Sequence, residues 1–283
     1  MDKIVRAIRR KAGFNQEQFA AALKTTVASI NRWENGKTIP HFRAQKRLEK
    51  LCRMLRMEKF VCDEIIKTYQ VEPEGDELIL YHGSKQGITG PLVPQSRDKT
   101  DFGRGFYLGT NVLQPLTLIC GENMPKMYSF KLNLQDLKVL KTEMDLLWTF
   151  LIAYNRGHMD QYKDSAIYRR FEEMTQSYDI IYGCIADDRM YEVMNSFFNG
   201  YITDIALLKS ISVLDLGFQY VCKTQSACDR LEQLSERTVT PFELSFLREI
   251  SAKRKEEGKR MSDEVVRQYR REGKFFDELI EEG

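Results

Sequence analysis

The chain has 283 residues, of which 42% are hydrophobic and 30% are charged. This length allows one large domain or two ordinary ones, and the composition excludes a chain that is disordered, collagen-like or held by a disulfide network throughout. The net charge of +2 is a sum over unlike parts, because residues 1–70 hold 16 Lys and Arg against 7 Asp and Glu, whereas the remainder holds 27 against 34. The asymmetry predicts two modules, of which the first faces a polyanion.

Cysteine and histidine usage argues against a zinc site. The six cysteines form no C-x-x-C pair and the chain has only three histidines, so we expect no metal. Scattered single cysteines are typical of a reducing cytosol. The N-terminus lacks the apolar run of a signal peptide, and the sequence contains no stretch of about eighteen apolar residues that would span a membrane. We therefore expect a cytoplasmic protein without a membrane partner.

The basic N-terminal segment, residues 1–57, shows the apolar spacing of consecutive short helices. We predict helices from residue 4 to about Gly13, then at Gln16–Ala22, Val27–Trp33 and Phe42–Leu55. Asn15 is a suitable N-cap for the second helix, and Thr25 or Thr26 for the third. Two helices joined by a tight turn form the arrangement that places the second helix in the major groove of DNA.

Two stretches of this segment carry a specific resemblance. Residues 15–20 read Asn-Gln-Glu-Gln-Phe-Ala, and residues 25–38 contain Trp-Glu-Asn-Gly-Lys. The segment resembles the Cro and phage-repressor (XRE) helix-turn-helix family. This resemblance implies that residues 1–57 bind DNA, with contacts from Gln16 to phosphate and from Thr26, Val27, Ala28 and Arg32 to bases.

Side-chain chemistry ranks these contacts. Arg32 can pair with guanine O6 and N7, whereas Val27 and Ala28 can touch only thymine methyl groups. Domains of this kind act as dimers on paired half-sites, so a homodimer is expected. The alternative is that the segment docks a protein or a second subunit and that its positive charge is an ordinary solvated face.

A change of composition marks a boundary after this segment. A helix predicted at Lys59–Tyr69 is followed by seven residues, Val71 to Glu77, in which Pro, Gly and four acids indicate a linker. Because the charge changes sign here, we divide the chain into a DNA-binding domain at 1–71, a second domain at 76–239 and a charged helical tail at 240–283.

The second domain mixes strands and helices, which predicts an α+β fold. The expected strands are Glu77–His82, Met127–Leu132, Leu137–Leu140, Tyr178–Gly183 and Gly217–Cys222. The expected helices are one that Thr110 caps and that ends near Ile119, then Met144–Tyr154, Asp160–Met174, Tyr191–Phe198, Asp204–Leu208 after a Thr203 cap, and Gln225–Leu234 after a Thr224 cap. Neither G-x-G-x-x-G after a strand nor a P-loop motif occurs, which argues against a Rossmann or P-loop nucleotide site.

Two blocks of this domain carry a second resemblance. The first is Tyr-His-Gly-Ser at residues 81–84, and the second is Asp-Phe-Gly-Arg-Gly-Phe-Tyr-Leu at residues 101–108. Together they resemble the ADP-ribosyltransferase superfamily in its His-Tyr-Glu branch, and within it an uncharacterised bacterial family. The resemblance implies a split-sheet fold with NAD as the substrate.

The same resemblance assigns roles to single residues. His82 would bond the adenosine-side ribose of NAD, the Gly83 backbone would bond the nicotinamide amide, and Tyr107 would stack on the nicotinamide ring. The expected NAD-contacting set is completed by Ser84, Arg97 and Phe106. Phe106 also suits a core position, and Arg97 either braces the loop with Asp101 or meets the NAD diphosphate.

The third motif position departs from the superfamily pattern. Gln219-Tyr220-Val221 resembles the run that supplies the catalytic Glu, so Gln219 fills the Glu position. A neutral amide accepts a hydrogen bond from a ribose hydroxyl but supplies no charge against a developing cation. Three outcomes stay open: slow mono-ADP-ribosyl transfer, NAD binding without turnover, or an acid from elsewhere. The candidate acids are Asp187, Asp188 and Glu192.

The combined prediction is a multidomain protein in which an all-α helix-turn-helix domain precedes an α+β, transferase-like split-sheet domain and a helical tail. Its expected function is NAD-dependent mono-ADP-ribosyl transfer to a protein or nucleic-acid acceptor. The implied setting is a toxin–antitoxin or phage-defence system, which adds an antitoxin partner. The alternative is a transcription regulator whose degenerate transferase domain senses NAD or ADP-ribose. RNA 2′-phosphate transfer is less favoured, because the acidic module shows no basic groove.

The charged tail from Thr240 onward is predicted to be helical, with breaks at Gly258 and Gly273. It either caps the second domain or docks a partner or second subunit.

Overall fold

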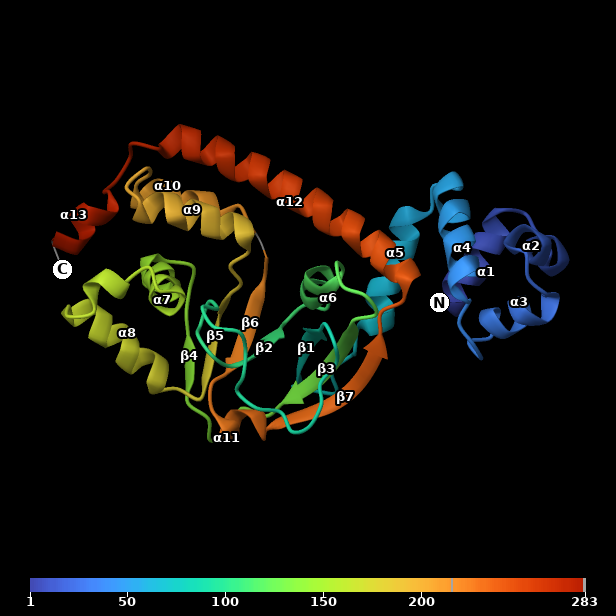
Figure 1. The fold of residues 1–283 in the computed structure, drawn as a ribbon, viewed down its shortest axis with the longest axis horizontal. Helices are drawn as coiled ribbons and strands as arrows, with labels where there is room; N and C mark the ends of the chain where they lie inside the picture. Colours follow the sequence, from blue (N-terminus) through green and yellow to red (C-terminus); the bar gives the residue numbers. More distant parts are fainter. Residues whose placement is uncertain (215, 282–283) are drawn as a thin grey trace.

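The structure, a computed structural model, describes residues 1–214 and 216–281. Figure 1 shows a group of helices at the N-terminal end, a twisted sheet with further helices beside it, and one long helix, α12, that runs from the N-terminal helices toward the far end of the molecule. A helical N-terminal region followed by a mixed seven-stranded sheet confirms the multidomain α+β class. No helix within the described ranges is long and apolar enough to cross a bilayer.

The five predicted N-terminal helices are confirmed. They are α1 Asp2–Lys11, α2 Gln16–Leu23, α3 Val27–Glu34, α4 Phe42–Met54 and α5 Glu58–Tyr69. Asn15 caps α2 and forms a capping box with Gln18. Thr26 rather than Thr25 caps α3, because its Oγ1 accepts a hydrogen bond from Ser29 N at 3.1 Å. These local contacts position α3 against the buried residues of α1 and α2.

The sheet has the strand order β4-β5-β6-β2-β1-β3-β7, and only β4 and β5 are parallel. Its strands are β1 Leu78–Ser84, β2 Phe106–Gly109, β3 Lys126–Leu132, β4 Val139–Lys141, β5 Ile180–Cys184, β6 Phe218–Cys222 and β7 Leu231–Thr238. All seven residues of β1 pair with β3, whereas β1 and β2 pair only through Tyr81 and Gly109. The sheet therefore consists of two well-paired parts with a narrow junction between them.

Helices cover the part of the sheet that contains β4, β5 and β6. The connecting segments form α6 Leu113–Ile119, α7 Leu146–Arg156, a 3₁₀ helix at Asp160–Tyr162, α8 Ala166–Gln176, α9 Asp188–Phe198, α10 Asp204–Ser212 and α11 Gln225–Cys228. Trp148 and Leu151 of α7 pack with Phe197 and Leu207 of α9 and α10 in one buried cluster. This cluster fixes the helices over one sheet face and holds the loop that contains Phe102.

Three predictions about helices in this domain are wrong. The single helix predicted over Asp160–Met174 is a 3₁₀ helix at Asp160–Tyr162 followed by α8 Ala166–Gln176. Thr110 does not cap α6; its Oγ1 instead donates to the Phe218 carbonyl at 3.0 Å, and α6 begins after Val112. The predicted helix Gln225–Leu234 ends at Cys228, and β7 follows it. The cause is tertiary. β7 is a largely exposed edge strand whose sequence shows little alternation of apolar and polar residues, and it forms a strand because it pairs with β3 along its whole length.

The tail is also more regular than predicted. α12 Pro241–Tyr269 continues through Gly258, so the expected break there is wrong. A Cβ at Gly258 would lie 3.0 Å from Leu214 Cδ2, and the glycine therefore permits a close approach of α12 to the end of α10. Gly273, at φ +91°, does separate α12 from α13 Phe276–Glu281. The last two residues of the predicted tail, 282 and 283, lie outside the described residues.

One buried cluster extends across the predicted domain boundary. It joins apolar side chains of the N-terminal helices to Tyr81 of β1, to α6, and to Phe242 and Phe246 of α12. Phe242 N donates to Gln45 Oε1 of α4 at 3.0 Å, and Tyr69 of α5 bonds Glu243 at 3.1 Å. The tail is thus packed on both parts of the protein rather than on the second domain alone.

Candidate functional site

The predicted base-contacting residues share an exposed surface of α3. Thr26, Val27, Ala28 and Arg32 are all exposed, and Val27 is 39% exposed although it is apolar. Figure 1 places α3 at the end of the molecule that lies away from the sheet. A duplex bound to this surface would therefore contact the N-terminal helices at the end of the molecule that lies away from the sheet.

Gln16 differs from the other predicted DNA contacts because its side chain holds the fold. Its Nε2 donates to Glu34 Oε2 at 2.9 Å, and Arg9 Nε donates to Glu34 Oε1 at 2.6 Å. Burial acts to raise the pKa of Glu34, which is 4% exposed, but the hydrogen bonds from Arg9 and Gln16 outweigh it and the pKa lies below its ordinary value. This charged network ties α3 to α1 and α2.

His82 lies on β1 directly after the junction at Tyr81 and Gly109. Its Nδ1 is 2.8 Å from the Tyr107 carbonyl oxygen, and its ring stacks on Phe106 with the centroids 4.5 Å apart. Burial lowers the pKa of His82 and prevails over the carbonyl contact, which raises it. A neutral ring that donates from Nδ1 to a carbonyl leaves Nε2 as a hydrogen-bond acceptor.

Gly83 and Ser84 follow His82 at the end of β1. A Cβ at Gly83 would lie 2.8 Å from Ile119 Cγ2 and 3.0 Å from the Pro115 carbonyl oxygen, so only glycine lets α6 pack this closely. Ser84 Oγ accepts a hydrogen bond from Gly87 N at 3.0 Å. Both residues therefore shape the end of β1, and Gly83 does so by having no side chain.

Phe106 and Tyr107 point to opposite faces of β2. Phe106 is 7% exposed and packs between His82 and Phe130, so the structure assigns it to the core as well as to the surroundings of His82. The Tyr107 hydroxyl donates to the Gly103 carbonyl at 2.7 Å and accepts from Phe102 N at 3.0 Å. Burial raises the pKa of Tyr107. Tyr107 therefore fixes the loop that leads into β2.

Gln219 occupies the centre of the sheet, where it is paired with Gly109 of β2 and Gly183 of β5. It is 6% exposed, and its Nε2 donates to Asp101 Oδ2 at 3.2 Å. Since it lies opposite Gly109, its side chain shares the face of Tyr107, whereas His82 lies opposite Tyr128 on the other face. His82 and Gln219 are thus on different faces; His82 contacts the Tyr107 carbonyl, whereas the Tyr107 and Gln219 side chains share the other face.

Asp101 forms an ion pair that the sequence did not predict. Arg156 at the end of α7 donates from Nε to Asp101 Oδ1 at 3.1 Å, and Ala186 N donates to Oδ2 at 3.2 Å. The alternative in which Asp101 pairs with Arg97 is therefore wrong, and Arg97 is an exposed residue of the same loop. Because Arg156 is 55 positions away from Asp101, no local sequence pattern could have revealed the pair.

The three candidate acids have different surroundings. Asp187 caps α9, with its Oδ1 accepting from Met190 N at 2.8 Å, and burial raises its pKa. Asp188 is exposed and pairs with Lys255 of α12 at 3.3 Å, and Glu192 bonds Arg189 at 2.8 Å. Asp187 follows Ala186, which bonds Asp101, so it is the candidate that the structure brings to the surroundings of Gln219.

The space beside Gln219 is filled in this structure. A Cβ at Gly109 would lie 2.5 Å from Gln114 Oε1, and one at Gly183 would lie 2.7 Å from Phe102 Cζ. A ligand ring that approaches Gln219 therefore requires the loop of Asp101 to Gly105 to move. His82, by contrast, is half-buried, and its Nε2 has no hydrogen-bond partner among the described residues.

Comparison with known proteins identifies two regions. Residues 78–233 match the family described as "Protein of unknown function (DUF3990)", and residues 5–58 match the family described as "Helix-turn-helix". Neither the curated proteins nor the solved structures include a match to the chain. The second match confirms the helix-turn-helix assignment of the N-terminal region, and the first covers both blocks that contain His82 and Tyr107.

Proposed function

Because the chain belongs to the DUF3990 family, whose description assigns no activity, we propose from the site itself that the second domain binds NAD and transfers ADP-ribose from it. The N-terminal region is a repressor-type helix-turn-helix domain, which binds DNA. The proposed protein is therefore a DNA-bound transferase. The acceptor and any antitoxin remain predictions.

The main support is the narrow junction between the two parts of the sheet. A neutral His82, held by the Tyr107 carbonyl at 2.8 Å, lies on one side of it. Tyr107 and Gln219 lie on the other side, around the same pair of strands. Once the loop of Asp101 to Gly105 has moved, an extended dinucleotide that passes through this junction from one face of the sheet to the other would meet all three residues, with a ribose hydroxyl donating to His82 Nε2 and a flat ring against Tyr107.

The chemistry of the proposed reaction is a substitution at ribose C1′. The bond from C1′ to the nicotinamide nitrogen breaks and its electron pair leaves with nicotinamide, while a lone pair of the acceptor forms the new bond and the acceptor releases its proton to solvent. The residues of this chain orient the dinucleotide through the contact of His82 with its adenosine-side ribose, and they exclude water through the buried face around Phe102. Gln219 supplies no charge, and Asp101 beside it is paired with Arg156, so we propose that transfer is slow.

The test uses labelled NAD with the full-length protein. We expect nicotinamide release and transfer of label, and we expect His82→Ala to reduce both by about 100-fold. Lys141→Ala, an exposed change at the end of β4, is the control and leaves both unchanged. A wild-type protein that neither binds NAD nor releases nicotinamide contradicts the proposal.

A second function is favoured by the surroundings of Gln219. Its amide is committed to Asp101 and the space beside it is filled, which suits a domain that binds a dinucleotide without cleaving it. Such a domain would make the protein an NAD or ADP-ribose sensor that regulates its own DNA binding. The same experiment separates the two: NAD binding that His82→Ala weakens, without nicotinamide release, supports the sensor.

A further inference from the structure

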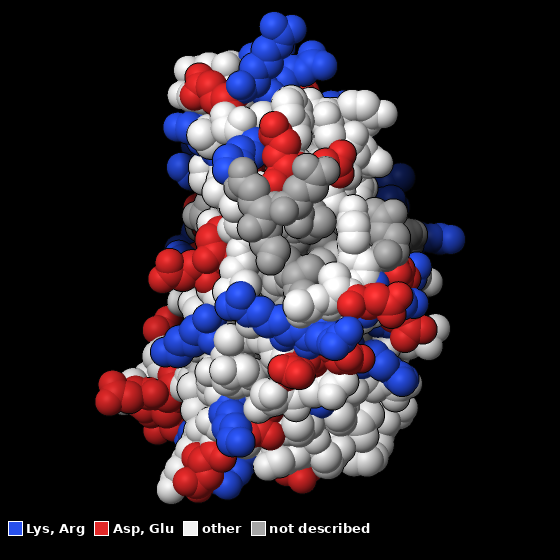
Figure 2. Space-filling model, turned by 90° about the vertical axis from the view of Figure 1, so that its left-hand side faces the viewer, with Lys and Arg blue, Asp and Glu red and all other residues white. Residues whose placement is uncertain are grey.

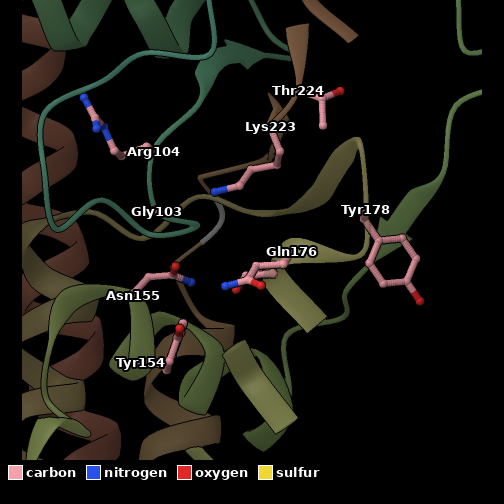
Figure 3. Close-up of a pocket in the computed structure, with 9 residues that line it drawn as sticks. Gly103, Arg104, Tyr154, Asn155, Gln176, Tyr178, Lys223 and Thr224 are labelled. Atoms are coloured by element: carbon pink, nitrogen blue, oxygen red, sulfur yellow. The ribbon is translucent and has the colours of Figure 1, made fainter. Parts of the chain in front are cut away.

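A cavity of about 560 Å³ opens at the end of β6, and His82 is not among the residues that line it. It is lined by residues of four segments: Gly103 and Arg104; Tyr154 and Asn155; Thr175, Gln176 and Tyr178; and Lys223 and Thr224. Its volume is in the range of roughly 300–1,000 Å³ that small-molecule sites occupy. Figure 3 shows the ends of Lys223, Asn155 and Gln176 pointing toward the middle of this space, whereas the Tyr178 ring points outward.

Lys223 and Asn155 converge on Gly103. A Cβ built on Gly103 would lie 2.6 Å from Asn155 Oδ1 and 3.2 Å from Lys223 Nζ, so both polar atoms approach the same point of the loop. Lys223 Nζ donates to the Phe102 carbonyl, and Asn155 Nδ2 donates to the Leu151 carbonyl at 2.8 Å. An ammonium group has three donors, and the Phe102 carbonyl uses one of them.

The charge of Lys223 is not balanced by a carboxylate in the described part of the chain. No ion pair of this lysine occurs there, although the side chain is half-buried. Burial lowers the pKa of Lys223 to about 8, so at neutral pH the group is still charged while partly removed from water. The other cation of the cavity is Arg104, which is exposed. An anion in the cavity would supply the missing opposite charge.

The second part of the chain carries no net positive charge that could attract a phosphate in place of this lysine. On the end of the molecule shown in Figure 2, Lys and Arg are interspersed with Asp and Glu. Residues 71–283 hold 27 Lys and Arg against 34 Asp and Glu. A phosphate group would thus be attracted by the local arrangement at Lys223 rather than by a general positive field.

We propose that this cavity binds a phosphorylated ligand of mononucleotide size, whose phosphate group contacts Lys223 and whose remainder lies against Asn155, Gln176 and Tyr154. The site is separate from the proposed NAD site, because the loop of Asp101 to Gly103 stands between them. One side of this loop is held by Tyr107, which bonds the Gly103 carbonyl, and the other by Lys223, which bonds the Phe102 carbonyl. A ligand phosphate that takes the remaining donors of Lys223 is thereby connected, through the Phe102 carbonyl, to the wall that the two sites share.

The experiment measures binding of 5′-AMP and of inorganic phosphate to the full-length protein by calorimetry. We expect AMP to bind wild type and Lys223→Met to weaken it by about tenfold or more, which corresponds to at least about 1.4 kcal/mol. Lys141→Met is the matched control on an exposed strand end and keeps wild-type affinity. Lys223→Arg keeps the charge and is expected to retain part of the affinity. Thermal unfolding of each variant shows that the protein is folded.

Two arms separate this site from the proposed NAD site. His82→Ala is expected to leave AMP binding unchanged, whereas loss of AMP binding in His82→Ala would place AMP at the NAD site and overturn the proposal. Absence of AMP and phosphate binding to wild type at about 5 mM would also overturn it. Failure of the NAD experiment would leave these outcomes unaffected, since none of them requires transfer.

Discussion

Single residues decide how much charge the candidate site presents. His82 is neutral because burial lowers its pKa, Gln219 is uncharged, and Asp101 is neutralised by Arg156. Asp187 is the remaining acid nearby, and burial raises its pKa. A site with so little net charge suits a ligand that is held by stacking and by hydrogen bonds to its hydroxyl groups.

The Glu34 network gives a residue-scale prediction about stability. Glu34→Gln removes the charge that Arg9 and Gln16 surround, and we expect a loss of about 2–4 kcal/mol at pH 7. Because the pKa of Glu34 is lowered on folding, its contribution is present above the unfolded value, about 4.3, and disappears as the pH falls through the folded value. Urea unfolding at pH 7 and at decreasing pH measures this, and the difference in stability between the two proteins should shrink as the pH falls.

Glu17→Gln serves as the control for this comparison, because Glu17 is exposed in the first turn of α2. It should change stability by less than about 1 kcal/mol at either pH. An equal loss of stability in Glu34→Gln and Glu17→Gln would show that the buried network contributes no more to stability than an exposed carboxylate does.

Elements were predicted best where the signal is local. Asn15 and Thr203 each cap a helix because a short polar side chain precedes an apolar periodic run. Strand β7 was missed, since its residues are mostly exposed and only pairing with β3 makes them a strand. The residues of the candidate site followed the same division: His82, Gly83 and Tyr107 lie within sequence blocks, whereas Arg156 and Lys223 reach their loops only through tertiary packing.

Helix α3 gives the prediction at the element scale. It exposes Thr26, Val27, Ala28 and Arg32 on one surface, and Arg32 carries the only charge among them. We expect Arg32→Ala to weaken binding to operator DNA by about 1–3 kcal/mol and to reduce discrimination at a guanine position. Gel shifts at several salt concentrations measure both. Arg32→Lys is the control, since it keeps the charge and loses the fork.

The loss of affinity for operator DNA in Arg32→Ala should exceed the loss of affinity for nonspecific DNA in Arg32→Lys. Equal affinity of wild type and Arg32→Ala for operator DNA would exclude α3 as the element that reads bases.

At the scale of the whole molecule, α12 joins parts that the sequence divides. Phe246 is fully buried, its ring lies 5.0 Å from that of Phe242, and the Arg53 guanidinium of α4 lies 5.1 Å from it. At its other end α12 is held by Arg189, which bonds Ser262 at 2.6 Å. The predicted boundary at 72–76 therefore marks a change of composition and not a break in the packing.

Phe246→Ala tests whether the two parts unfold together. We expect a loss of about 3–5 kcal/mol, because the change leaves a cavity in the shared core. The two tryptophans report on the two parts: Trp148→Phe leaves Trp33 in the helix-turn-helix, and Trp33→Phe leaves Trp148 in α7. In both backgrounds the fluorescence midpoint should move by the same amount.

Phe275→Ala is the matched control, since Phe275 is 37% exposed, and it should shift the midpoint little. Two separate transitions, of which only one responds to Phe246→Ala, would show that α12 does not couple the parts.

Because α12 is bonded at both ends, it fixes the orientation of the second domain relative to the N-terminal helices as well as its position. The 29 residues of α12 extend for about 43 Å, and their two ends are bonded to different parts of the protein. A protomer seated on DNA would therefore point its sheet toward a definite side of the duplex. Two protomers on sites separated by whole turns of about 10.5 base pairs would point the same way, and those separated by a half-turn would point apart. Site spacing would then decide which pairs of second domains can reach a common target.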